Sequence, residues 1–377
     1  MKKKLFIIIS LLTLFTVFTS CSNKNETENK ETIVDMVDRK VEIIPGSYQR
    51  VVCIGAGALR LYSYIGDVNK LSGVEDIDNY TLENRPKIFD SVARPYFIAY
   101  KEVFKNLPSC GVGGPQAQAA EVEKILVCNP DIVISEYEDV DKENALEKQL
   151  GVPVITVRYG SKGVFDENIK KSIELLGKVF SLEDRANALN EFIDSEKSAI
   201  EARVSGIVSS NEKKVYICGL GNWGTTNHLM TVQNYEPFNV SKINNVINGL
   251  VKDGIQAIDE EKYLAISDDI DVLIIDSAAI KNIIDKNVFE PLKAWKNGEV
   301  YLQMAYNAYY TNIEIALINT WYNAKVVYPS LFSDIDMTEK TNEVTKAFLG
   351  KELASEIFSY PNSFGGYKKM DTTTFPN

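Results

Sequence analysis

The sequence predicts an α/β fold in which two lobes, each with a mostly parallel sheet, are joined by one long α-helix. Short β-rich runs alternate with helical segments in residues 32–162 and again in residues 207–377, and this alternation is typical of βαβ units. Residues 163–206 differ, because charged and apolar residues recur there at helical spacing over a stretch without proline. We therefore expect an N-terminal lobe, a connecting helical segment and a C-terminal lobe, with a cleft between the lobes.

The chain begins with a segment typical of a secretory signal. Lysines precede an apolar run from Leu5 to Phe18, which is shorter than the roughly 20 residues that span a membrane. Cys21 follows where a lipoprotein signal is cut, although Phe18 stands where leucine is usual. We expect residues 1–20 to be removed and Cys21 to carry lipid; ordinary secretion and an uncleaved anchor are the alternatives. Residues 21–31 are then a polar, flexible tether that holds the protein on the outer face of the cytoplasmic membrane, at the cell surface or on the periplasmic side.

Composition limits the partners and the chemistry. Removing the three lysines of residues 1–20 takes the formal net charge from −11 to −14, so nucleic acid is not an expected partner. The cysteines beyond Cys21 form no C-x-x-C pair. We expect buried free thiols rather than a metal site, while a disulfide between the lobes stays open. These cysteines are Cys53, Cys110, Cys128 and Cys218.

The elements of the first lobe follow in order. Residues 32–45 alternate apolar and polar side chains across a tight turn, which predicts a β-hairpin. Residues 50–59, "RVVCIGAGAL", predict a strand that ends in glycines. Residues 120–139 predict a helix, an Asn-Pro break and an apolar strand, and residues 146–160 repeat that plan.

The connecting segment and the second lobe are predicted in the same way. Ser181, with Asp184 three residues later, resembles the N-cap of a helix over residues 182–204. Gly350 stands where a C-cap is expected. The second lobe is expected to contain strands within residues 213–224 and 295–303, a helix, turn and strand over 261–277, and helices over 312–329 and 338–350.

An enzyme is not expected. Arg60 stands where the third glycine of a dinucleotide-binding loop belongs, and no P-loop, serine-hydrolase or zinc-protease motif is present. His228 is the only histidine, which excludes a zinc or manganese site built from several imidazoles. A two-carboxylate glycosidase and a partner-binding lipoprotein are minor alternatives. No cofactor is expected.

Segments spread over nearly the whole chain resemble the iron-complex substrate-binding proteins of ABC importers. They include "DRKVEIIPGSYQRVVCIG", "LPSCGVGGPQAQAAEVEKILVCNPDIVIS", "LKAWKNGEVYLQ" and "AKVVYPSLFSDIDMTEKTNEVTKAFLG". The resemblance implies a monomeric, lipid-anchored protein with a rigid helical backbone. It would capture a ferric complex, a siderophore or haem, and deliver it to a permease and its ATPase. A corrinoid, or molybdate or tungstate, is the alternative ligand.

The resemblance also implies two carboxylates that pair with arginines of the permease. Glu123 and Glu261 occupy the matching positions, one in each lobe, with Glu121 and Glu260 as neighbouring alternatives. Acidic residues in a first helical turn are also favoured by the helix dipole alone. Both explanations therefore stay open.

The ligand is expected between the lobes, at the loops that follow the strands. Arginines there can bind an anionic ligand in bidentate fashion. Tyrosines can stack on rings, donate hydrogen bonds or ligate the iron of a bound complex through phenolate oxygen, and no other direct metal ligand is expected. The candidate contacts are Arg60, Arg94, Tyr96, Tyr100, Arg158, Trp223, His228, Tyr306, Tyr309 and Tyr310.

Overall fold

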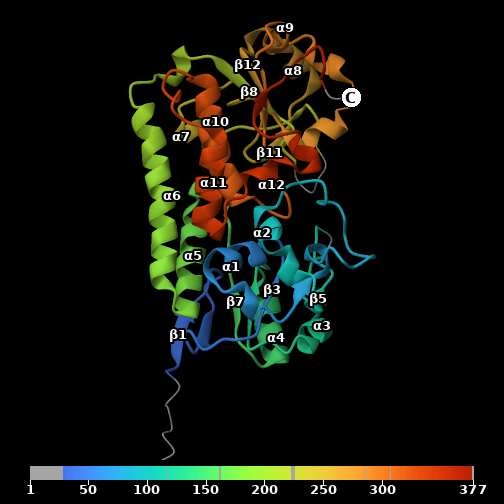
Figure 1. The fold of residues 1–377 in the computed structure, drawn as a ribbon, viewed down its shortest axis with the longest axis vertical. Helices are drawn as coiled ribbons and strands as arrows, with labels where there is room; N and C mark the ends of the chain where they lie inside the picture. The colour runs from blue at the N-terminus through green and yellow to red at the C-terminus, as the bar shows by residue number, and fades with distance from the viewer. Residues whose placement is uncertain are drawn as a thin grey trace, which may run out of the picture.

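The computed structural model describes residues 29–115, 117–160, 163–221, 226–283, 285–305 and 307–375. Two α/β halves are stacked along the long axis, with the N-terminal half below and the C-terminal half above in Figure 1. The long helix α6 runs along one side of both halves. The predicted α/β fold with two mostly parallel sheets is confirmed.

The N-terminal half is built on a three-stranded parallel sheet in the order β3-β6-β7. The predicted hairpin is confirmed as the antiparallel pair β1 and β2, and β4 pairs in parallel with β5. The strands are β1 (Glu31–Val34), β2 (Lys40–Ile43), β3 (Val51–Ile54), β4 (Val74–Glu75), β5 (Ser109–Gly111), β6 (Ile132–Ser135) and β7 (Val154–Thr156). The helices are α1 (Ala58–Ile65), α2 (Pro95–Phe104), α3 (Val122–Val127) and α4 (Val140–Leu150).

Two helices connect the halves, α5 (Glu167–Phe180) and α6 (Glu183–Arg203). The predicted role of Ser181 as an N-cap is wrong. Ser181 instead ends α5 in the left-handed conformation, with φ of 52°, and α6 begins after Leu182. The turn is this tight because Gly177 lies against Ala186, where a Cβ on the glycine would approach within 2.6 Å.

The C-terminal half contains a five-stranded sheet in the order β10-β8-β12-β13-β14, parallel except for its last pair. A short antiparallel pair, β9 and β11, lies beside it. The strands are β8 (Lys214–Cys218), β9 (Met230–Val232), β10 (Asn244–Asn245), β11 (Ile255–Ala257), β12 (Val272–Asp276), β13 (Val300–Gln303) and β14 (Lys368–Lys369). The helices are α7 (Glu236–Val240), α8 (Glu260–Ala265), α9 (Lys293–Lys296), α10 (Ile313–Val327), α11 (Met337–Leu349) and α12 (Ala354–Phe358). Gly350 caps α11 in the left-handed conformation as predicted, with φ of 69°.

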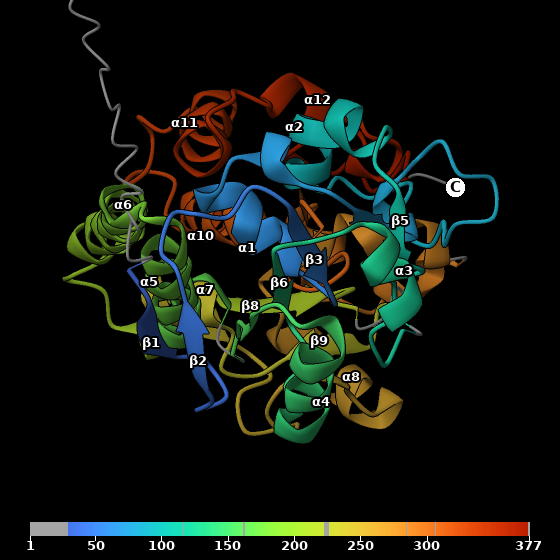
Figure 2. The same ribbon diagram turned by 90° about the horizontal axis from the view of Figure 1, so that it is seen from below.

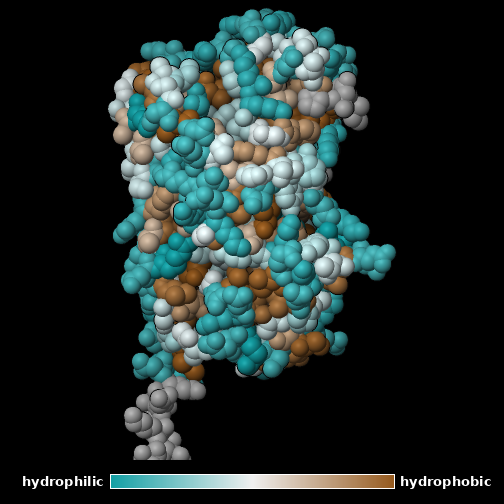
Figure 3. Space-filling view, in the orientation of Figure 1, coloured by the Kyte–Doolittle hydropathy of each residue, from teal (hydrophilic) through white to brown (hydrophobic). Residues whose placement is uncertain are grey.

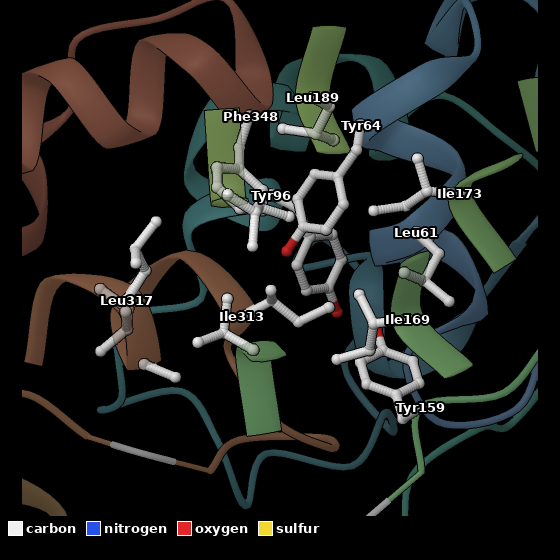
Figure 4. Packing of buried hydrophobic residues seen from close by; sticks show 14 of the residues in the cluster. Leu61, Tyr64, Tyr96, Tyr159, Ile169, Ile173, Leu189, Ile313, Leu317 and Phe348 are labelled. Atoms are coloured by element: carbon white, nitrogen blue, oxygen red, sulfur yellow. The ribbon is translucent and has the colours of Figure 1, made fainter. Parts of the chain in front are cut away.

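The largest hydrophobic core crosses from one half to the other. Buried side chains of α1, α2, α5, α6, α10 and α11 belong to one cluster, and Figure 4 shows Tyr64, Tyr96, Ile169, Ile313 and Phe348 packed together. The central strands β6, β8 and β12 are buried on both faces, as expected for parallel strands covered by helices. The four cysteines of the described chain are buried and free, as predicted.

The register of the parallel strands fixes where loops gather. Ile54, Ser135 and Thr156 are paired neighbours at the ends of β3, β6 and β7, so the loops after these strands leave one edge of the sheet. Such an edge is where ligands bind in open α/β sheets. Within the described residues, no helix is both long and apolar enough to cross a membrane.

Candidate functional site

The turn between β13 and α10 has an unusual backbone. Tyr309 and Tyr310 both have positive φ, 53° and 70°, and residues Asn307 and Thr311 pair across the turn. Two successive residues with positive φ are usually asparagine and glycine, as in type I′ turns. Each such tyrosine costs about 1–2 kcal/mol. Strain of this kind persists where surrounding contacts fix it, and it is concentrated at functional sites.

Arg60 of α1 holds this turn from the opposite lobe. Its buried guanidinium donates hydrogen bonds to the carbonyl oxygens of Ala308, at 2.7 Å, and Tyr309, at 3.1 Å, and to Oδ1 of Asn312, at 3.0 Å. It also lies over the ring of Tyr96, 4.9 Å from the centroid. Arg60 therefore ties the lobes together, and its two terminal nitrogens, which the sequence analysis assigned to a ligand, donate to the chain instead.

Glu75, at the end of β4, holds the same turn. The Tyr309 hydroxyl donates to Oε2 of Glu75 at 2.5 Å, and the N–H of Gly55 donates to Oε1 at 3.0 Å. Burial raises the pKa of Glu75 to about 7, although both hydrogen bonds act in the opposite direction. Tyr309 is 4% exposed, so this predicted ligand contact is a link between the lobes.

Arg94 and Tyr96 form a second buried cluster, around Asp78. Arg94 pairs with Asp78 at 2.5 Å, and the Tyr96 hydroxyl donates to the same carboxylate oxygen at 2.8 Å. Both side chains are at most 2% exposed. Tyr100 donates its hydroxyl to the carbonyl of Leu349 at 2.7 Å. All three predicted contacts are therefore occupied by partners within the protein, and they stabilise the packing of α2.

A more open group of side chains lies beside the turn. The ring of Tyr310, which is 37% exposed, packs at 4.6 Å against Tyr159, whose hydroxyl donates to the carbonyl of Gly57. Burial, followed by the charges of Glu136 and Glu138, raises the pKa of Tyr310 to about 12. The two phenol rings and the loop that follows β6 are therefore neighbours.

The same group contains a carboxylate, that of Glu136, which has no hydrogen-bond or ion-pair partner in the described chain. Burial, with Glu138 and Glu75 nearby, raises its pKa to about 8. The predicted contact Arg158 is half-buried, and it pairs with Glu138 at 2.6 Å. The group therefore combines carboxylate and phenol oxygen atoms with aromatic rings, and the positive charge of Arg158 is already balanced by Glu138.

Other predicted residues have different surroundings. The half-buried ring of His228 packs edge-on against Tyr263 of α8 and against Phe289, and burial lowers its pKa. Cys21, Trp223 and Tyr306 lie outside the described residues. Among the residues that the structure does describe, no three His, Cys, Asp or Glu side chains are arranged to hold a metal ion.

The carboxylates predicted to dock on a permease are exposed. Glu123 and Glu261 lie in the first turns of α3 and α8, and neither has an ion-pair partner in the described chain. Glu121, the neighbouring alternative, instead accepts a hydrogen bond from the N–H of Val112 at 2.6 Å and pairs with Lys124 at 2.9 Å. The structure therefore leaves Glu123, rather than Glu121, free to contact another molecule.

Three residues of this site were not predicted individually. Glu136 and Tyr159 lie in loops that the sequence analysis placed at the cleft, and the signal that identifies them is an acidic or aromatic residue within three positions of the end of a buried strand. Glu75 ends a two-residue strand, and nothing local distinguishes it from other acidic residues. Its partner Tyr309 is 234 positions away.

The geometry defines a class of protein: two α/β lobes around a site at the carboxyl ends of strands, with a helical connection. The chain belongs to the periplasmic binding protein family, whose model matches residues 51–305. Members of this family are extracytoplasmic substrate-binding proteins of ABC transporters. They are not enzymes and carry no cofactor, which confirms those two predictions.

Individual relatives are distant. The chain is 21% identical over 340 residues to the molybdate-binding protein MolA of Haemophilus influenzae, covering 84% of this chain and 90% of MolA. The structure of molybdate-bound MolA superposes with a TM-score of 0.65 at 18% identity, covering 85% of this chain and 98% of that one. A periplasmic solute-binding protein of Veillonella parvula gives 0.68 at 18% identity, covering 89% and 98%. Helicobacter pylori CeuE with bound Ni(II) gives 0.57 at 15% identity, covering 87% and 99%.

Proposed function

We propose that this protein captures a ferric complex, a siderophore or haem, between its lobes and delivers it to an ABC permease with its ATPase. The observation that carries the proposal is the group around Tyr310. Two phenol rings and an unpaired carboxylate, Glu136, lie together at the carboxyl ends of the strands. Phenolate and carboxylate oxygens suit ferric iron, and the rings suit an aromatic chelator.

The charge of the site supports the same choice. Glu136, Glu138 and Glu75 all raise the pKa values of neighbouring groups, and Arg158 already pairs with Glu138. In the described part of this group no free cation is left to bind an oxyanion, because Arg158 pairs with Glu138, whereas a metal centre gains from nearby oxygen ligands. We therefore assign ligand contact to Tyr310 and Glu136, and a supporting role to Tyr159 and the other buried residues.

The remaining predicted residues keep the roles that their surroundings allow. In this proposal Trp223 and Tyr306, from the C-terminal lobe, complete the ligand site together with Arg158. Arg60, Arg94, Tyr96, Tyr100 and Tyr309 hold the lobes and the strained turn, and His228 stabilises the packing beneath α8.

The position of the protein in the cell belongs to the same proposal. A lipid on Cys21 and a tether over residues 21–31 would hold a monomer at the outer face of the membrane. Glu123 and Glu261 would then face a permease. Residues 32–162, 163–206 and 207–377 are proposed as the N-terminal lobe, connecting segment and C-terminal lobe.

To test the proposal, the protein is titrated with a panel of ligands, and binding is measured as quenching of its tryptophan and tyrosine fluorescence. The panel contains a catecholate and a hydroxamate ferric siderophore, haem, cobalamin and molybdate. We expect a ferric complex or haem to bind, and Tyr310→Phe and Glu136→Gln to weaken that binding at least tenfold. Tyr80→Phe is the matched control, because Tyr80 is 38% exposed and lies outside the site. Binding of molybdate alone would overturn the ligand assignment.

Molybdate or tungstate is the second candidate, because the curated relative MolA binds molybdate. The two candidates differ in their response to pH. With a pKa of about 8, Glu136 is mostly protonated at neutral pH and can donate a hydrogen bond to an oxyanion. Oxyanion binding should therefore weaken above pH 8. Binding of iron through the carboxylate should strengthen over the same range, because the metal no longer has to displace a proton.

A further inference from the structure

The helices α3 and α8 present the same surface pattern, once in each lobe. Both helices directly precede a buried strand of their sheet, and both contain Glu-Lys, a buried residue and leucine: residues 123–126 are "EKIL" and residues 261–264 are "EKYL". The third residue faces the core, since Ile125 is 0% and Tyr263 1% exposed. The leucines are exposed to the same degree, Leu126 at 49% and Leu264 at 48%.

The lysines of the pattern are directed toward their own lobes. Lys124 pairs with Glu121 at 2.9 Å and approaches Asp76 at 3.9 Å. Lys262 donates to the carbonyl of Leu250 at 3.4 Å. Glu123 and Glu261 are therefore left without a cation in the described chain, and each is available to pair with a positive group of another molecule.

Each leucine lies beside its carboxylate. Residues three apart are neighbours on a helix surface, so Glu123 with Leu126, and Glu261 with Leu264, each form one carboxylate–leucine pair. Val127, at 76% exposure, extends the first pair, and Figure 3 shows hydrophobic surface over the part of the lower lobe where α3 lies. Both α3 and α8 lie toward the side opposite α6 in Figures 1 and 2.

We propose that Leu126 and Leu264 are apolar anchors for the permease, one in each lobe, and that each seats next to a basic group paired with the neighbouring carboxylate. The inference rests on the proposed docking function. A single exposed leucine is ordinary on a protein surface, but here it recurs at the same place relative to an unpaired carboxylate in both lobes. A repeated contact of one kind fits a partner with two like halves, each offering a basic side chain beside an apolar surface.

The partner is first identified by photo-crosslinking in the producing bacterium. Benzoylphenylalanine is placed at position 126 or 264, and crosslinked peptides are identified by mass spectrometry. The proposal expects both positions to crosslink to the same membrane permease. Position 208 is the control, because Val208 is an exposed apolar residue, at 58%, outside α3 and α8. Crosslinks to a second copy of this chain, to no protein, or to a permease from position 208 equally would overturn it.

The contribution of the leucines is then measured with that permease–ATPase complex in nanodiscs. Leu126→Asn and Leu264→Asn should each weaken binding by about fivefold, the effect of losing burial of about half a leucine side chain, and together by about 25-fold. Val208→Asn should bind normally. If Glu123→Gln and Glu261→Gln weaken binding but the leucine variants do not, the anchors are refuted and docking stands. If neither pair has an effect, both proposals fail.

Discussion

The acidic link between the lobes makes stability depend on pH, and Glu75→Gln isolates its contribution. Glu75 is fully buried, and its pKa rises from 4.5 to about 7. The folded protein therefore keeps this proton until about pH 7, whereas the unfolded chain releases it near pH 4.5. Because the unfolded state binds fewer protons in this window, the stabilisation is complete below pH 4.5 and is lost as the pH rises through 7. Between pH 5 and pH 8 the loss is about 2–3 kcal/mol.

Glutamine cannot titrate but keeps the local hydrogen bonds. Its oxygen can accept from Gly55, and its amide can donate to the Tyr309 hydroxyl. In urea denaturation, Glu75→Gln should therefore gain about 2–3 kcal/mol relative to the wild type between pH 5 and pH 8. Glu201→Gln, a change at an exposed residue of α6, should leave the wild-type pH dependence unchanged. Parallel stability profiles for the wild type and Glu75→Gln would refute the reasoning.

Three more predictions concern the lobe contact and the ligand. Arg60→Met should lower the free energy of unfolding by about 3–5 kcal/mol, because buried carbonyls and the turn lose their partner. Arg50→Met, at a side chain 49% exposed, should cost under about 1 kcal/mol; equal effects in urea denaturation would contradict this. Tyr310→Asn should weaken ligand binding at least tenfold with little change in thermal midpoint, because asparagine tolerates the left-handed conformation; a large fall in scanning fluorimetry would contradict a binding role. Ligand binding should leave the radius of gyration nearly unchanged in solution scattering, because Arg60 and α6 restrict rotation; a large decrease would contradict a rigid connection.

The fold could be predicted because it depends on local signals. Apolar runs mark the buried strands β6 and β12, and the alternation in residues 32–45 marks the hairpin. Proline-free helical spacing marks the connecting segment, though not its tight turn. Ser181 fits an N-cap by composition, but the close approach of Gly177 and Ala186 decides that it ends α5 instead.

The site could be predicted only at the level of loops. Arg60 lies next to a glycine-rich segment and Arg94 next to an aromatic one. Arginines that bind ligands occur in the same sequence contexts, so the context does not separate the two roles. What distinguishes them is long-range pairing: Arg60 with Ala308, 248 positions away, and Arg94 with buried Asp78. No local pattern reveals where a buried charge finds its partner. Tyr309 and Tyr310 are adjacent in sequence, but Tyr309 is buried and Tyr310 is exposed. The left-handed backbone of both residues accompanies this difference, and the sequence does not reveal it.

The cost of the lobe contact is itself an argument for its function. A turn of two left-handed tyrosines is about 2–4 kcal/mol less stable than one of asparagine and glycine, and Glu75 and Glu136 add carboxyls whose ionisation burial opposes. Aliphatic side chains would join the lobes more stably. These unfavourable choices lie together with Tyr159 and Tyr310 at the ends of the strands. Sequences depart from local rules chiefly at functional sites. In the proposed function, the strained turn therefore presents Tyr310 to the solute, and Arg60 supplies the rigidity that keeps the turn in place.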